Sequence, residues 1–347
     1  MMGMKDSPTA DDTYRFPMNG GEFLLAGTFG ELRSNHFHSG IDIKTGGSVG
    51  KALYAVRDGY VYRIKASPWG FGKAVYLRHA DGEFSVYGHM NGYSREIQDY
   101  LYQKQYASKQ FEQELYLAED EMPVKKGQLI GYSGNSGSSH GPHLHFEIRD
   151  PEEAITNPLR FYRSLVSDHK KPEVVGIAFE PLSIGARASE KFEKLIIKPT
   201  GSAGNYTVPE VIRLKGKVGL EYDAFDLLDG APNHCGINYT KLYLDGRQIF
   251  EFTLDKFSFD NKRYINVHFD YTHNKNGGRK FERAYVELGN QLPCYSNLEN
   301  GGLIDLQDDL VHSLRLELGD GYHLSLIHIS EPTRPLYISY AVFCLKK

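Results

Sequence analysis

Short runs of strand-forming residues, separated by glycine-containing turns, recur along most of this 347-residue chain. In the first half they include Ala52–Ile64, Ala74–His79 and Phe84–His89, and Ala-Asp-Gly lies between the last two as a hairpin turn. Long helical segments do not alternate with these runs, which argues against parallel strand–helix–strand units. The 36 glycines and 24 tyrosines suit turns and cross-strand aromatic pairs. We therefore predict a mainly β protein with antiparallel sheets.

One segment departs from this pattern. Residues 94–120 contain neither glycine nor proline and are rich in Gln, Glu, Lys and Ala. This composition favours a polar helix inserted between strands. Two roles for the insertion are open: a solvated excursion of the chain, or a wall beside a substrate groove.

The length of the chain allows two domains, each with its own core. The polar segment Ser167–Pro172 ends in proline and predicts a boundary between them. We predict a first domain over residues 14–166. Over residues 172–323, repeated short strands with Asp-Gly turns predict an immunoglobulin-like β-sandwich that serves as an accessory domain and is truncated.

Both ends of the chain are unusual. Residues 324–334 read LSLIHISEPTR, which resembles the translation of a transposase-type sequencing adapter. We therefore expect residues 324–347 to be a non-native read-through tail, and its apolar run to be no membrane anchor. Residues 1–17 have neither the basic nor the apolar region of a signal peptide, so any such signal was removed or lies upstream.

The overall composition excludes several classes of function. The formal net charge of −4, with mixed signs along the chain, supplies no basic field for nucleic acid. No window approaches the roughly 20 apolar residues of a membrane span. Cys235, Cys294 and Cys344 lack C-x-x-C spacing, which argues against a structural zinc ribbon. Cys235 and Cys294 are either a disulfide pair or two separate buried thiols.

Two short stretches carry residues of the kinds that bind metals: His38-Ser-Gly-Ile-Asp42 and His143-Leu-His145. Residues two apart in a strand share a face, so the two histidines of the second stretch point the same way. His38, Gly40 and Asp42 also share parity, and Gly40 leaves room for an ion. Pairing of the two stretches would join His38, Asp42 and one imidazole of the histidine pair in a tetrahedral cluster. Three ligands leave the open position that distinguishes a hydrolytic zinc from a structural one.

If one histidine of the His143/His145 pair completes the set of three ligands, the other histidine does not bind the metal. A neutral imidazole beside the water of such a site can act as general base. A hydrolase further needs a group that stabilises the oxyanion of the tetrahedral intermediate. The stretch Tyr87-Gly-His-Met90 is the best candidate, because His89 ends a predicted strand and Gly88 permits close approach of the backbone.

Together, H-x-x-x-D, Y-x-H-[ML] and G-x-H-x-H-F-E resemble the motifs of lysostaphin/LytM-type zinc metallopeptidases, which cut the peptide part of bacterial peptidoglycan. The similarity covers roughly Phe29–Phe161, with the motifs in the family's order. By this resemblance, one Zn²⁺ is bound by three ligands and flanked by two catalytic histidines. The implied metal ligands are His38, Asp42 and His145, the implied general base is His143, and the implied second catalytic histidine is His89.

Three features depart from the family pattern: the insertion at residues 94–120, Met90 where leucine is usual, and the additional histidines His36 and His140. The resemblance implies a zinc-dependent endopeptidase that hydrolyses peptide bonds in peptidoglycan stem peptides or cross-links. It also implies a place in the cell envelope, in the periplasm or outside the cell. The alternative is a non-catalytic wall-binding or amidase-activating regulator of the same fold. Envelope proteins are possible partners of the second domain.

Overall fold

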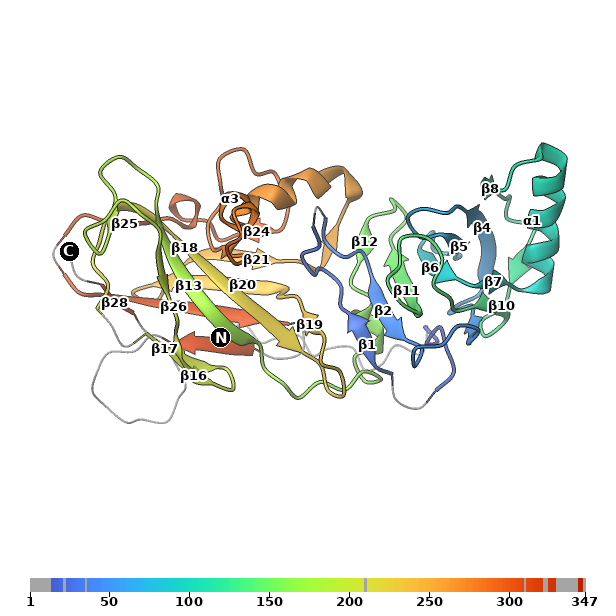
Figure 1. Cartoon of the computed structure of the whole chain (residues 1–347), viewed down its shortest axis with the longest axis horizontal. Helices are drawn as coiled ribbons and strands as arrows, with labels where there is room; N and C mark the ends of the chain where they lie inside the picture. Colours follow the sequence, from blue (N-terminus) through green and yellow to red (C-terminus); the bar gives the residue numbers. More distant parts are fainter. Residues whose placement is uncertain are drawn as a thin grey trace. The chain divides into compact units, whose positions relative to one another are not determined.

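The computed structural model describes residues 14–20, 23–34, 36–208, 211–308 and 310–320, together with the backbone of 324–328 and 343–345. The chain divides into two compact units (Figure 1). Unit 1 comprises the described residues up to Phe29 and then His38–Ser167, whereas unit 2 comprises Gly30–Phe37 and the described residues from Asp168 onward. The domain limits 14–166 and 172–323 stay predictions.

Unit 1 is built on one antiparallel sheet, which confirms the expected mainly β architecture. In spatial order its strands are β1 (Leu25–Gly27), β2 (Ile41–Lys44), β11 (His143–Arg149), β6 (Phe84–Met90), β5 (Lys73–Arg78), β4 (Gly59–Ala66) and β8 (Gln113–Tyr116). Strand β9 (Pro123–Val124) pairs with β4, and β12 (Ile155–Thr156) pairs with β11. A second sheet contains β3 (Ala52–Tyr54), β10 (Leu129–Tyr132) and β7 (Gly92–Tyr93), and the short helix α2 spans Leu159–Tyr162.

The two faces of β11 have different chemistry because its side chains alternate between them. One face presents Leu144, Phe146 and Ile148, all of which are fully buried. Phe146 also makes an edge contact with Tyr87 of the neighbouring strand β6, with ring centroids 5.2 Å apart. The apolar face of β11 therefore packs into the core, while its histidines lie on the opposite face.

The inserted segment forms a helix only in its first half. Helix α1 spans Arg95–Ser108, buries Ile97 and Leu101, and ends at Lys109 in the left-handed conformation. The prediction of a helix over residues 94–120 is therefore too long, since Gln113–Tyr116 pairs with β4 as strand β8. Alternate residues of β8 are half-buried and exposed, a period of two that suits an edge strand.

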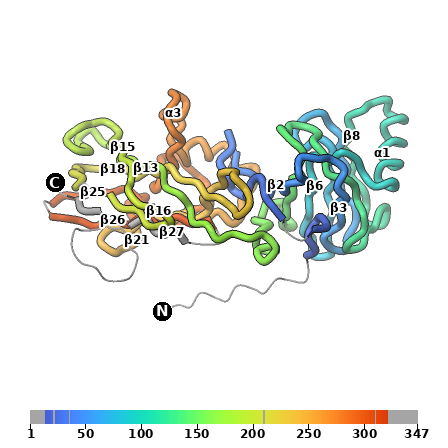
Figure 2. Tube along the Cα trace, turned by 60° about the horizontal axis from the view of Figure 1, so that its bottom comes forward, coloured from blue at the N-terminus to red at the C-terminus, as the bar shows by residue number. Residues whose placement is uncertain are grey.

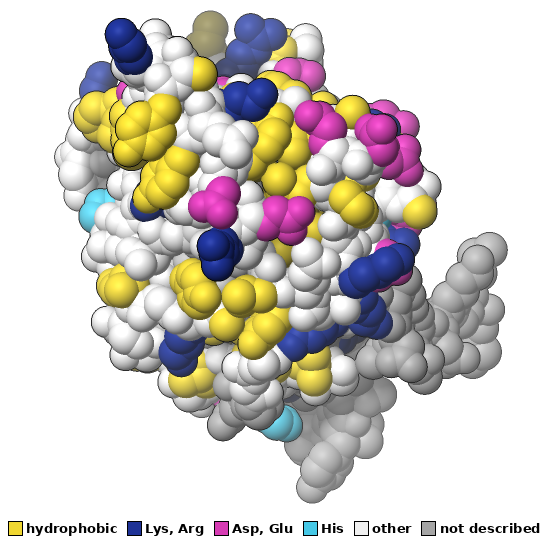
Figure 3. Space-filling view, turned by 90° about the vertical axis from the view of Figure 1, so that its right-hand side faces the viewer, with side chains coloured by type: hydrophobic (Ala, Val, Ile, Leu, Met, Phe, Trp, Pro, Cys, Tyr) yellow, Lys and Arg dark blue, Asp and Glu magenta, His cyan; other side chains and the backbone are white. Residues whose placement is uncertain are grey.

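Seen from the side of α1, unit 1 exposes hydrophobic side chains among basic and acidic ones (Figure 3). Four aromatic residues of the insertion contribute to the exposed surface of unit 1: Tyr102, Tyr106, Phe111 and Tyr116. That the insertion borders a substrate groove stays a prediction.

Unit 2 contains two sheets, and β13 and β18 of the first run side by side (Figure 2). The first sheet has the order β14 (Arg187–Ala188), β18 (Leu214–Leu227), β13 (Glu173–Pro181), β15 (Leu195–Ile197), with β19 (His234–Cys235), β23 (Glu282–Arg283) and β25 (Ile304–Leu306) also paired to β18. The second has the order β16 (Thr200–Ser202), β17 (Asn205–Thr207), β27 (Leu324–His328), β26 (His312–Gly319), β20 (Tyr239–Leu244), β21 (Arg247–Thr253), β24 (Tyr295–Ser296). An immunoglobulin-like arrangement of these strands stays a prediction.

The remaining elements of unit 2 are short. They are β22 (Lys256–Phe257), the 3-10 helices η1 (Phe259–Val267) and η2 (Asn300–Gly302), the helix α3 (Tyr271–Lys275), and β28 (Phe343–Leu345), which pairs with β26. The backbone of residues 324–328 also pairs with β26, and the non-native origin of residues 324–347 stays a prediction. Cys235 and Cys294 are free, buried thiols, so of the two alternatives the structure has the unpaired one.

Candidate functional site

Three side chains of unit 1 converge on one point. The Nε2 atom of His38 lies 3.0 Å from Oδ1 of Asp42 and 3.1 Å from Nδ1 of His145. The same Asp42 oxygen lies 3.0 Å from His145 Nδ1. The pairing of β2 with β11 produces this contact, because Asp42 and His145 are direct cross-strand partners. His38 reaches the cluster from the loop that precedes β2.

The second ring nitrogen of each histidine in the cluster is held by a hydrogen bond. His38 Nδ1 lies 2.7 Å from the carbonyl oxygen of Thr28, which can only accept, so Nδ1 carries the proton and Nε2 presents a lone pair. His145 Nε2 lies 3.0 Å from Oε1 of Glu147, which orients the ring so that Nδ1 faces Asp42. Partners of this kind orient metal-bound histidines and raise their basicity.

Glu147 and Arg149 support the site through His145, and the sequence analysis did not identify them. Glu147 is fully buried, and Arg149 Nε donates to its Oε2 at 2.7 Å. The charge of Arg149 holds the pKa of Glu147 at about 2 against the opposing effect of burial. Strand parity contained the signal, because His145 and Glu147 lie two residues apart on the same face of β11.

The donor set of His38, Asp42 and His145 fits a divalent metal ion such as Zn²⁺. Two imidazole nitrogens and a carboxylate oxygen lie within 3.1 Å of one another, and such lone pairs repel unless a cation lies among them. Burial alone would lower the pKa of His145, but hydrogen bonds to Asp42 and Glu147 raise it to about 9. Against the effect of burial, the surrounding histidines hold the pKa of Asp42 well below its usual range. The centre therefore attracts positive charge.

His143 and His89 flank this centre. His143 Nδ1 lies 2.8 Å from the carbonyl oxygen of Gly141, which turns Nε2 toward Asp42 Oδ1 at 3.4 Å. The rings of His89 and His143 have centroids 4.9 Å apart. The structure thus brings together all five residues selected from the sequence.

The backbone of His89 has an unusual conformation. Its φ of +57° lies in the left-handed region, which costs a non-glycine residue on the order of 1–3 kcal/mol. Two contacts hold it: its N–H donates to the carbonyl of Phe71 at 2.8 Å, and its Nδ1 lies 2.8 Å from the carbonyl oxygen of Ser136. Phe71 also stacks on His145, with centroids 4.7 Å apart. Phe71 and Ser136 are therefore supports of the site that the motifs alone did not indicate.

Burial lowers the pKa of His89 to about 4, and the positive charge of His145 acts in the same direction. His89 is therefore neutral near pH 7. Because Nδ1–H donates a hydrogen bond to the carbonyl oxygen of Ser136, Nε2 presents a lone pair in this state. His89 can accept a proton at Nε2, and it can donate to an oxyanion only after it has done so.

Gly40 serves a different purpose from the one expected. A Cβ atom at this position would lie 2.2 Å from the carbonyl oxygen of Phe146, which real structures do not tolerate. The missing side chain therefore permits close approach between the chain before β2 and strand β11. It does not provide room for the ion, since the backbone of β11 fills that space.

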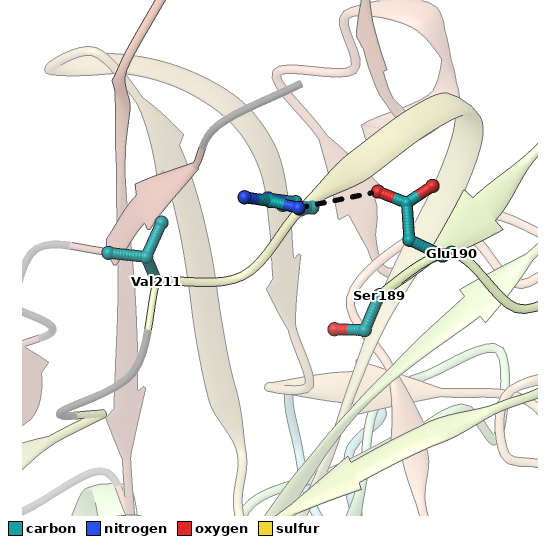
Figure 4. Close-up of a pocket in the computed structure, with 4 residues that line it drawn as sticks. Ser189, Glu190 and Val211 are labelled. Atoms are coloured by element: carbon teal, nitrogen blue, oxygen red, sulfur yellow. Dashed lines mark ion pairs between the residues drawn. The ribbon is translucent and has the colours of Figure 1, made fainter.

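A separate surface pocket in unit 2 has none of this chemistry. Ser189, Glu190, Val211 and Arg213 line it, and Arg213 Nη1 lies 3.8 Å from Glu190 Oε1 (Figure 4). Both charged side chains are more than half exposed, so the ion pair is the weak, solvated kind. None of the five site residues belongs to this pocket.

Comparison with known proteins agrees with the geometry of unit 1. Residues 36–115 and 102–158 match the model of Peptidase family M23. The DD-carboxypeptidase/endopeptidase Mpg of Neisseria meningitidis serogroup B is 31% identical over 118 residues, which are 34% of this chain and 21% of that protein. The murein hydrolase activator NlpD of Escherichia coli is 31% identical over 153 residues, 44% of this chain and 32% of that protein.

Among solved structures, a mutant catalytic domain of the prophage-encoded M23 protein EnpA from Enterococcus faecalis is 27% identical, with a TM-score of 0.30. That match covers 41% of this chain and 93% of the other. The chain spans only 21% and 32% of the lengths of the two curated relatives. The region of residues 36–158, which contains the five site residues, therefore matches peptidase family M23.

Proposed function

We propose that this protein is a zinc-dependent endopeptidase that hydrolyses peptide bonds in peptidoglycan stem peptides or cross-links. One observation carries the proposal: a buried three-ligand cluster has an imidazole nitrogen, His143 Nε2, 3.4 Å from its Asp42 oxygen. A site for metal binding alone would not need a histidine so placed. The names of the similar proteins, a DD-carboxypeptidase/endopeptidase and a murein hydrolase activator, support peptidoglycan as the substrate class.

The zinc ion would be held by His38 Nε2, Asp42 Oδ1 and His145 Nδ1. When bound it supplies a Lewis acid, which polarises the scissile carbonyl and makes water more acidic. His143 Nε2 accepts the proton of the attacking water, since the bond from Nδ1 to Gly141 leaves that nitrogen as an acceptor. The protonated ring then returns a proton to the leaving amine.

His89 acts beside the developing oxyanion. Because its neutral ring presents a lone pair at Nε2, it contributes a hydrogen bond to the oxyanion only after taking up a proton. With ring centroids 4.9 Å apart, His89 lies directly beside the proposed general base His143. The contribution of His89 therefore depends on its own uptake of a proton.

Digestion of purified peptidoglycan tests the proposal. We expect the zinc-loaded protein to release new amino termini, with the cleaved bond identified by mass spectrometry of the soluble fragments. His143→Ala should keep its zinc but lose about 10²–10⁴-fold in rate, as removal of a general base does. His38→Ala should lose the zinc itself. If the protein binds zinc, releases no amino termini and behaves like His143→Ala, the enzyme proposal is wrong.

A second candidate function is that of a non-catalytic regulator that activates a separate cell-wall amidase. Similarity to the murein hydrolase activator NlpD favours it. An assay with an added amidase distinguishes the two candidates. If the protein is an activator, the His143→Ala variant should stimulate the amidase as strongly as the unaltered protein does. An enzyme should instead release peptide fragments without the amidase.

We place the protein in the cell envelope, in the periplasm or outside the cell, where its proposed substrate lies. Unit 2 is proposed as an accessory domain that binds the wall or an envelope protein. Among the residues that the structure describes, no helix is both long and apolar enough to cross a membrane.

A further inference from the structure

Unit 2 contains three buried aspartates whose carboxylates meet. One oxygen each of Asp168, Asp226 and Asp320 lies within 4.8 Å of the others. Their exposed fractions are 6%, 1% and 7%. The three residues come from separate parts of the fold: Asp168 precedes β13, Asp226 belongs to β18, and Asp320 directly follows β26.

Asp226 has a buried carboxylate oxygen, Oδ1, that has no hydrogen-bond partner among the residues that the structure describes. Nor does any described lysine, arginine or histidine lie within ion-pair distance of its carboxylate. Leaving a buried carboxylate unpaired is costly. Burial, together with the charges of Asp320 and Asp168, raises the pKa of Asp226 to about 8.

A second acidic group in unit 2 shows how the protein compensates such charge elsewhere. Glu180, Glu221 and Asp270 also form a close cluster. There, Lys194 Nζ lies 3.4 Å from Glu180 Oε2 and also pairs with the other two carboxylates. That cluster contains its own cation. The ammonium of Lys170, by contrast, donates to the carbonyl of Leu228 at 3.3 Å and acts on Asp226 only through space.

We propose that Asp168, Asp226 and Asp320 bind a calcium ion, at a site separate from the metal centre of unit 1. Calcium ligands lie about 2.3–2.6 Å from the ion, so two oxygens on one ion are at most about 4.6–5.2 Å apart. The 4.8 Å limit on the aspartate oxygens satisfies this condition. An all-oxygen set suits calcium, whereas zinc prefers nitrogen and sulfur ligands. Three carboxylates, one calcium ion and the nearby Lys170 ammonium sum to zero charge.

The calcium ion would connect both sheets of unit 2, because Asp226 lies in the sheet of β13 and β18 while Asp320 follows a strand of the other sheet. Asp168 adds the segment that leads into β13. The three ligands meet only when the separate segments are folded, so calcium binds the folded state and not the unfolded one. Calcium therefore stabilises the folded unit by mass action. The proposal does not depend on the endopeptidase function, because it predicts an effect on stability.

Titration of the full chain with calcium chloride tests the site, after passage of the protein through a chelating resin and reloading with one equivalent of zinc. We expect binding with Kd on the order of 10⁻³ M or tighter, and a melting temperature that rises with calcium. Asp226→Asn should weaken calcium binding at least tenfold and abolish the rise. Without calcium, this variant should melt at or near the temperature of the parent protein, because a pKa of about 8 keeps most of the Asp226 side chain protonated near pH 7 and asparagine is the neutral counterpart of that form.

Two variants serve as controls. Asp223 lies on the same strand as Asp226 and pairs with Arg279 at 3.2 Å. The Asp223→Asn variant should therefore keep the rise of the melting temperature with calcium. Asp42→Asn alters the zinc centre and should retain it too. The proposal is overturned if the parent protein shows no calcium-dependent heat or melting shift, or if Asp226→Asn keeps the full effect. Should Asp226→Asn fail to fold, Asp320→Asn decides by the same measurements.

Discussion

The two ring nitrogens of His145 contact different groups. Nδ1 faces His38 and Asp42 in the proposed metal centre, whereas Nε2 faces Glu147. Arg149 in turn fixes Glu147, so a chain of charge-assisted hydrogen bonds extends from the ligand set along the histidine-bearing face of β11. Because these groups are buried, each hydrogen bond is stronger than it would be in water. The orientation of one ligand thus depends on residues that touch no metal.

The role of Glu147 leads to the first prediction. Glu147→Gln removes the buried negative charge behind His145, and we expect zinc affinity to fall about 10–100-fold, the usual effect of losing such a partner. Competition with a chelator measures this. Glu153→Gln is the matched control, because Glu153 contacts the same Arg149 at 3.3 Å from a half-exposed position. Equal zinc affinities in the two variants would contradict the role given to Glu147.

The second prediction concerns pH. The folded pKa of His145 is raised to about 9 from an unfolded value near 6.5, so its protonation stabilises the metal-free protein fully below about pH 6.5. That stabilisation is lost as the pH rises through 9. Bound zinc displaces the proton from His145, so the zinc-loaded protein should lack the stabilisation that this proton provides. For the same reason, zinc should bind more tightly as the pH rises toward 9.

Urea unfolding of both forms between pH 6.5 and 9.5, with chelator-buffered zinc, measures the effect. Ionisable groups outside the centre contribute equally to both forms, so the difference between them reports on the centre that contains His145. A difference that stays constant over this pH range would contradict the prediction.

The third prediction concerns the strained backbone of His89. His89→Ala and His89→Gly both remove the imidazole and should both lose most of the hydrolytic activity. Glycine adopts a φ of +57° without the penalty that alanine incurs, so His89→Gly should be about 1 kcal/mol more stable than His89→Ala. Urea unfolding compares the two variants. An alanine variant of equal or greater stability would show that the backbone is not strained.

At the scale of elements, the register between β2 and β11 decides which side chains meet at the proposed metal centre. Asp42 opposes His145, and His143 lies two residues earlier on the same face. A slip of one residue would turn every side chain of a strand to the other face. The apolar face of β11, with Phe146 and Ile148 fully buried, makes such a slip costly and so holds the ligands in place.

Helix α1 gives the fourth prediction. Only two side chains of α1, Ile97 and Leu101, are buried. The packing of the helix against the rest of unit 1 therefore depends mainly on these two residues. Leu101→Ala should cost about 2–5 kcal/mol, as other buried leucines do, whereas the exposed Gln103→Ala should change stability by less than about 0.5 kcal/mol. Urea unfolding distinguishes the two. Similar values would mean that α1 is not anchored by its buried face.

At the scale of the whole molecule, each unit has its own polar cluster with its own chemistry. Unit 1 has imidazole nitrogens and one carboxylate, while unit 2 has three carboxylates. This difference in donor atoms suits different ions, zinc in the first and calcium in the second. We therefore expect two metals per chain, of which only zinc is required for hydrolysis.

The fifth prediction concerns residues 324–347. If LSLIHISEPTR is translated adapter sequence, an independently cloned copy of the gene should encode a different continuation after about residue 323. Sequencing of freshly amplified genomic DNA checks this. A clone that again encodes LSLIHISEPTR would establish the segment as native.

Part of this molecule was predictable because the signals are local. Strand parity has a period of two, so the sequence alone indicated the mainly β class and the shared face of His143 and His145. The family resemblance implied which of them binds metal. The helix over residues 94–120 was overestimated because polar composition does not reveal pairing, and β4 recruits Gln113–Tyr116 as a strand.

By itself, then, the sequence indicated the fold class, the family resemblance and the candidate ligands, because motifs and strand periodicity each span only a few residues. Only the tertiary structure showed that Gly40 lies against the backbone of β11 and that Glu147 lies behind His145. It alone brought Asp168, Asp226 and Asp320 together. No local pattern links these aspartates, because strand pairing and chain entry bring them together from far apart in the sequence.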